Sequence, residues 1–173
     1  MLGPISTPDS MPTSSISRWL LAPLALAFFA LPAAAQDAPS DARVEQALDQ
    51  NNVSYSAESN GDYRVLFTLP NERSQLVWIS PRTDTIGSLD VRRVFSYAAA
   101  TDEGQALSSG WAEQLLRNNA GYAVGGWSLT GNRVVFSATV PADASARVLL
   151  DTVALVMTTA DGVEAELTGA DGW

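Results

Sequence analysis

The fold is decided by residues 123–140, which read AVGGWSLTGNRVVFSATV. Two apolar segments, Ala123–Leu129 and Arg133–Val140, flank the turn residues Thr130-Gly131-Asn132, and this arrangement predicts a β-hairpin. One face of the later segment is apolar at every second position, namely Val134, Phe136, Ala138 and Val140. Because strand side chains alternate between faces, this face is predicted to lie against a hydrophobic core.

The preceding part of the chain predicts a helix followed by further strands. Asp41 is a candidate N-cap for a helix that ends near Asn51-Asn52. Residues 53–57 and 63–67 alternate around a turn at 59–62, which predicts a second hairpin, and Gln75–Ile79 predicts a third strand. We expect residues 81–88 to form a loop and Val91–Tyr97 to form an edge strand.

Two further helices are predicted on either side of residues 123–140. Apolar residues at helical spacing after Gly104 predict a helix that ends near Asn118. After Asp143, a broad apolar stripe predicts a largely buried final helix that ends or kinks at Asp161-Gly162. Residues 163–173 are then expected to be a polar tail, loose from Thr168 onward.

The order of these elements is α-β-β-β(-β)-α-β-β-α. Antiparallel hairpins combined with helices predict an α+β fold, with the helices packed on one antiparallel sheet. Residues 42–162 are expected to form this single domain.

The first 35 residues have the features of a secretory signal peptide. Arg18 precedes an apolar run from Trp19 to Leu31, and small residues precede a predicted cleavage site between Ala35 and Gln36. We therefore expect a periplasmic or secreted protein with no membrane span after cleavage, in which residues 36–41 form a flexible leader. An uncleaved anchor is the alternative, and translation could start at Met1 or Met11.

Composition excludes several classes of function. The chain has 10 basic and 19 acidic residues, a net charge of −9, and no histidine or cysteine. Nucleic-acid binding is disfavoured, because such proteins need clustered positive charge. Without histidine and cysteine, the usual catalytic triads, most zinc sites and thiol chemistry lack their residues, so we expect no cofactor or metal and no enzyme activity.

Carboxylate chemistry remains open as an alternative. Asp84, Asp90, Asp102 and Glu103 lie in or near predicted loops, and paired carboxylates can cleave glycosides. This alternative is a hydrolase acting on cell-wall glycan. Solvated surface carboxylates are the simpler interpretation.

A possible partner surface comprises Arg92, Arg93, Phe95 and Trp127. The pair Arg92-Arg93 beside Phe95 and Tyr97 would present a basic and aromatic patch, which suits recognition of an anionic partner. An edge strand protected by charge explains Arg92 and Arg93 equally simply, and Trp127 could belong to the core. The neighbouring Gly125-Gly126 could let another chain approach Trp127 closely.

Several segments resemble the YbjN-like family. They are Leu115–Ala120 (LLRNNA), Gly125–Leu129 (GGWSL), Val134–Phe136 and the apolar final helix, and the likeness covers residues 42–160. The resemblance implies a non-catalytic domain, similar in fold to type III secretion chaperones, of the kind described as a sensory transduction regulator. It also implies dimer formation and binding to segments of other proteins, and it supplies no catalytic residues.

These observations together predict an exported binding, chaperone-like or regulatory module of the bacterial envelope. Its expected partner is an envelope protein or peptide, with a homodimer as a further possibility.

Overall fold

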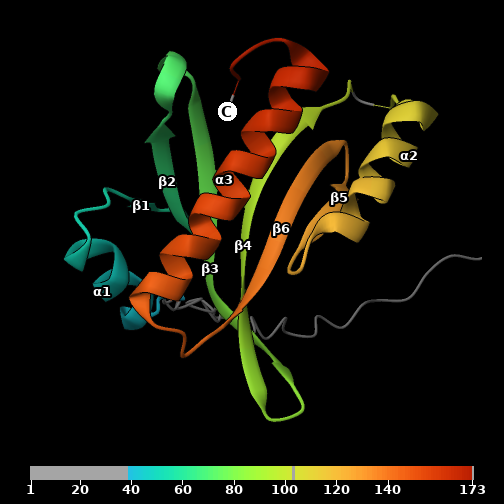
Figure 1. Ribbon diagram of the computed structural model, residues 1–173. Coiled ribbons are helices and arrows are strands. Elements are labelled where there is room, and N and C mark those ends of the chain that lie inside the picture. Colours follow the sequence, from blue (N-terminus) through green and yellow to red (C-terminus); the bar gives the residue numbers. More distant parts are fainter. Residues whose placement is uncertain (1–38, 103, 173) are drawn as a thin grey trace, which may run out of the picture. The chain divides into compact units, whose positions relative to one another are not determined.

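The computed structural model describes residues 39–102 and 104–172, which form an α+β fold as predicted (Figure 1). Six antiparallel strands make one sheet in the order β1-β2-β3-β4-β6-β5. The strands are β1 (Ser56–Ala57), β2 (Tyr63–Thr68), β3 (Ser74–Ile86), β4 (Leu89–Ala100), β5 (Gly126–Thr130) and β6 (Arg133–Pro141). The helices are α1 (Ala42–Gln50), α2 (Ser109–Asn118) and α3 (Ala146–Thr168).

One face of the sheet carries the hydrophobic core. Helix α3 runs across this face (Figure 1), and Val153 and Val156 pack among strand residues such as Phe136. Leu48 of α1 and Leu115 of α2 belong to the same cluster. All three helices therefore bury apolar side chains against one face. Each fully buried side chain of this size contributes roughly 1.5–3 kcal/mol.

Strands β3 and β4 are longer than predicted, and the expected loop at residues 81–88 is mostly strand. The register shifts between Ile79 and Thr83, so Pro81 lies at an irregularity where its missing N–H is tolerated. Gly87, with φ of 64°, forms the turn into β4. Because β6 pairs with β4 only as far as Val91, residues 84–90 form a two-stranded arm beyond the sheet.

The prediction of an edge strand at Val91–Tyr97 was wrong. These residues lie in β4, which pairs with β3 on one side and with β6 on the other. Strand β6 follows β4 only after α2 and β5, so local sequence gave no indication of this pairing.

Helix α3 does not end at Asp161-Gly162, where the sequence suggested a stop or kink. It continues to Thr168 and ends at Gly169, which adopts the left-handed conformation with φ of 63°. A helical glycine costs about 1 kcal/mol relative to alanine. Burial of Val163 and an ion pair between Asp161 and Arg73, at 2.6 Å, compensate for that cost.

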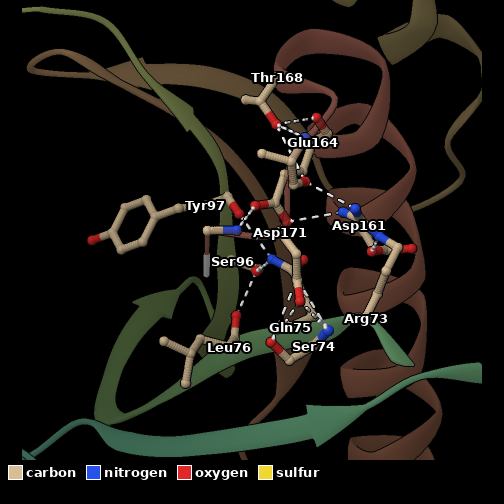
Figure 2. A network of polar contacts seen from close by, with 12 residues as sticks. Arg73, Ser74, Gln75, Leu76, Ser96, Tyr97, Asp161, Glu164, Thr168 and Asp171 are labelled. Carbon is tan, nitrogen blue, oxygen red and sulfur yellow. Dashed lines mark hydrogen bonds and ion pairs between the residues drawn. The ribbon is translucent and has the colours of Figure 1, made fainter. Parts of the chain in front are cut away.

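The expected polar tail at residues 163–173 is also not loose over its described part, which ends at residue 172. Figure 2 shows the end of α3 and the residues after it around Arg73 and Ser74. Asp171 accepts a hydrogen bond from the Ser74 amide at 3.1 Å, and the Gly172 amide donates to Glu164 at 2.7 Å. Burial raises the pKa of the Glu164 carboxyl. We call these contacts the C-terminal clasp.

The leader predicted at residues 36–41 ends earlier than expected, and residues 36–38 lie outside the described part. Asp41 caps α1 by accepting a hydrogen bond from the Arg43 amide at 2.9 Å. Its carboxylate also pairs with Arg92, with 2.6 Å between Oδ2 and Nη2. The Arg92 side chain is only 2% exposed, so this ion pair is buried within the fold.

We predict that Asp41→Asn lowers the free energy of unfolding by about 3 kcal/mol, because it leaves the charge of Arg92 buried without a counter-ion. Asparagine keeps the size of the side chain and the ability to cap α1, so the change isolates the charge. Chemical denaturation measures the effect. Asp151→Asn is the matched control: Asp151 is 74% exposed, and its loss should change stability by no more than about 0.5 kcal/mol.

The pH dependence of stability provides a second readout for the same pair. Hydrogen bonds from Arg43 and then from Arg92 hold the pKa of Asp41 well below its ordinary value of 3.8. The resulting stabilisation is present above that value and is lost as the pH falls below it. Asp41→Asn should therefore show a smaller loss of stability than the wild type on acidification below 3.8. Equal losses would contradict this role for Asp41.

We predict that deletion of residues 170–173 destabilises the protein by roughly 1–3 kcal/mol, because Glu164 stays buried without its amide donor. Gly169 is retained, so the helix keeps its C-cap. Asp171→Ala, which removes only the acceptor for Ser74, should have a smaller effect. Thermal and urea unfolding compare the variants, and an unchanged midpoint after the deletion would show that the clasp contributes nothing.

Candidate binding face

The face of the sheet opposite the core is not covered by any helix of the described residues. Side chains that are directly paired across strands share a face, and the register pairs Arg64 with Trp78 and Trp78 with Phe95. Arg93 and Tyr97 lie on the same face by alternation along β4. We call this surface the open face, and its principal residues are Arg64, Leu66, Leu76, Trp78, Arg93, Phe95, Tyr97 and Arg133.

Three aromatic rings form a cluster at the centre of the open face. The rings of Trp78 and Phe95 are stacked, with centroids 5.7 Å apart, and Tyr97 meets Trp78 edge-on at 4.8 Å. Such pairs stabilise by about 0.5–1.5 kcal/mol beyond their buried area. Phe95 is only 5% exposed, so the accessible part of the cluster is formed by the half-buried rings of Trp78 and Tyr97.

Arginine side chains lie over two of these rings. The guanidinium of Arg93 is 4.4 Å from the centroid of Phe95, and that of Arg133 is 4.7 Å from the centroid of Tyr97. A guanidinium held over an aromatic face is attracted by the ring quadrupole. The open face thus combines apolar area with positive charge in a chain of net charge −9.

A hollow lies beside the aromatic cluster, where the turn between β1 and β2 approaches the sheet. Its volume is about 350 Å³, and Trp78, Phe95 and Tyr97 form its apolar side. The polar side includes Arg64 and Glu58, whose charged atoms are 3.8 Å apart. A concave surface with aromatic walls and a few polar groups is the usual form of a ligand-binding site.

The structure brings two of the four predicted surface residues together. Arg93 and Phe95 are in contact on the open face. Arg92 was placed wrongly on that surface, because adjacent residues of a strand point to opposite faces. Its guanidinium pairs with Asp41 and donates hydrogen bonds to the carbonyl oxygens of Ser80 and Ala142, both at 3.2 Å.

Trp127 is also not on the open face, since it is 7% exposed and packs edge-on against Phe136 in the core. Asn119, at the end of α2, binds both backbone groups of Trp127: its Oδ1 accepts from the amide at 2.6 Å and its Nδ2 donates to the carbonyl at 3.2 Å. Trp127 and Leu115 line a small apolar cavity of about 210 Å³ between α2 and β5.

Gly125, the first of the two glycines before Trp127, does not make room for another chain. This residue has φ of 82°, and a Cβ there would collide with the backbone of Ser137 and Ala138 in β6. Glycine is required at this position by the protein's own packing.

The carboxylates considered for catalysis are not gathered in one place. Asp84 and Asp90 lie on the two-stranded arm, where Asp90 accepts a hydrogen bond from Thr85 at 2.6 Å. Asp102 follows the opposite end of β4, roughly 30 Å or more away at the rise of an extended strand. Glu103 and the predicted cleavage site at Ala35 and Gln36 lie outside the described residues. Within the described ranges, no group of three or more acidic side chains is arranged to hold a metal ion.

The surface hypothesis, in which Arg92 and Arg93 lie beside Phe95 and Tyr97, did not include Arg64, Trp78 and Arg133, which also lie on the open face. Alternation places Tyr97 with Phe95, and this signal was visible in the sequence. Arg64, Trp78 and Arg133 join them only through the pairing of separate strands.

We predict losses of stability of different size for two tryptophan substitutions. Trp127→Ala should destabilise the protein by about 4 kcal/mol, because it leaves a cavity in the core. Trp78→Ala removes a ring from the partly exposed open face and should cost about 1 kcal/mol. Urea denaturation of both variants tests the assignment of faces, and equal losses would contradict it.

None of the helices in the described part is long and apolar enough to span a membrane. In comparisons with known proteins, no family model matches the sequence and no curated protein matches it.

Proposed function

We propose that the protein is an exported, non-catalytic binding module of the bacterial envelope, chaperone-like or regulatory in type. It would hold an envelope protein or peptide on the open face. The observation that carries this proposal is the aromatic cluster of Trp78, Phe95 and Tyr97, with arginines over two of its rings, on a sheet face that no described helix covers.

The chemistry of the open face supports binding of another polypeptide. Aromatic residues and arginine are enriched at the centres of protein interfaces, where they contribute most of the binding free energy. Leu66, at the edge of the cluster, is 59% exposed and extends the apolar area. The sequence features before residue 36 support export, and the resemblance to YbjN-like proteins agrees with a role without catalysis.

We predict that a photo-crosslinking amino acid at Leu66, in the full chain expressed in a bacterial host, forms a specific adduct with an envelope protein. The matched control is the same amino acid at Val148, which is 46% exposed on α3. Mass spectrometry identifies the adducts. If both positions give the same adducts, or if neither gives one, the open face is not the binding surface.

The same experiment tests export. The N-terminus of the crosslinked protein should be Gln36, as expected for cleavage after Ala35. An adduct that retains residues 1–35 would contradict release from the signal peptide.

A further inference from the structure

We propose that the hollow beside the aromatic cluster binds a lysine side chain of the polypeptide held on the open face. The ammonium group pairs with the carboxylate of Asp62, and the aliphatic part of the lysine packs on the ring of Trp78. This inference rests on the proposed function and specifies the chemistry of the partner. It replaces the expected anionic partner, which required Arg92 and Arg93 on one surface, whereas Arg92 is buried.

The first argument is the environment of Asp62, which lines the hollow and is only 8% exposed. Its Oδ2 accepts a hydrogen bond from the Asn60 side chain at 2.9 Å. Among the residues that the structure describes, no arginine lies within ion-pair distance of this carboxylate. A buried charge is costly without a counter-ion, so a cationic ligand gains free energy by supplying one.

Other buried carboxylates of the described part do have such a counter-ion. Glu164 pairs with Arg73 at 3.4 Å, and Asp41 pairs with Arg92 at 2.6 Å. Asp62 differs from both because it lies in the wall of a hollow that is open to a ligand.

The second argument is the charge of the hollow as a whole. Its charged lining residues are Glu58, Asp62 and Arg64, so two carboxylates face one guanidinium. Arg64 lies at 3.8 Å from Glu58, and both side chains are partly exposed, so this pair contributes little. One added positive charge neutralises the hollow. The net charge of −9 over the whole chain also attracts cations.

The third argument is the aromatic side of the hollow, which Trp78, Phe95 and Tyr97 form. A cation near a tryptophan ring is attracted by its quadrupole, and the methylene groups of lysine pack on apolar surface while the charged end stays at a polar site. Within the protein itself, Phe95 and Tyr97 already hold the guanidinium groups of Arg93 and Arg133 over their rings. The cluster is therefore a surface on which positive groups are stable.

The fourth argument favours lysine over arginine as the cation. A guanidinium binds a carboxylate best when it bridges both oxygens, and Asn60 already binds Oδ2 of Asp62. An ammonium group is a compact point charge that needs only one oxygen. The volume of about 350 Å³ lies at the lower end of the range for ligand pockets, which suits a single side chain.

The test uses protein purified after expression of the full chain and two short fluorescent peptides with blocked ends. Each has one lysine between two leucines, and in the second peptide this lysine is acetylated, which removes its charge. Fluorescence anisotropy should show at least about tenfold tighter binding of the unmodified peptide. Asp62→Asn keeps an acceptor for Asn60 and should abolish the preference. Asp151→Asn, the same change at an exposed site on α3, should leave it intact.

The remaining outcomes separate this inference from the proposed function. Equal affinity for the two peptides, no binding of either, or a preference that survives Asp62→Asn overturns the lysine proposal. Competition by n-butylamine as strong as that by the unmodified peptide would assign the hollow to free amines and would also overturn it. The binding function still stands in each case if Leu66 forms a specific adduct in the cell. Thermal unfolding confirms that each variant is folded, and the comparison of the two peptides on the wild type needs no variant.

Discussion

The buried ion pair between Asp41 and Arg92 is the interaction on which the arrangement of the domain depends. These residues are 51 positions apart in the sequence, and the guanidinium also binds the carbonyl oxygens of Ser80 and Ala142. One side chain thus connects the start of α1, strand β3, strand β4 and the link between β6 and α3. A buried charge is costly unless every donor has a partner, so these segments must assemble together.

The position of Arg92 also determines what the other face of the sheet can do. Adjacent residues of β4 point in opposite directions, so fixing Arg92 among the core elements places Arg93 on the open face. The same alternation sends Val94 into the core and brings Phe95 beside Arg93. A single register shift in β4 would exchange the two sets, burying the aromatic cluster and exposing the apolar residues. The candidate binding surface is therefore a direct consequence of the core.

Local sequence patterns predicted the α+β fold because each helix and hairpin has its own periodicity. The turn at Thr130-Gly131-Asn132 and the apolar alternation of β6 are complete within a few residues. The central position of β4 in the sheet depends on its pairing with β6, which is distant in sequence. The C-terminal clasp depends on the ion pair between Arg73 and Asp161 of α3, which are also distant in sequence. For the site, alternation could separate Arg92 from Arg93 only once the buried side of the strand was known. Arg93 interrupts the apolar odd positions of this segment, and this interruption concealed which side of the strand is buried.

Asn119 affects how the outer edge of strand β5 can pair with a further strand. Strand β5 is the last strand of the sheet, and its sequence from Gly126 to Thr130 contains no charge or proline, the residues that normally discourage further strands from adding. The Asn119 side chain binds Trp127 on both its N–H and its C=O, as a peptide group of a neighbouring strand would. These two backbone groups of the edge strand are therefore already bound and do not offer an added strand a free donor and acceptor.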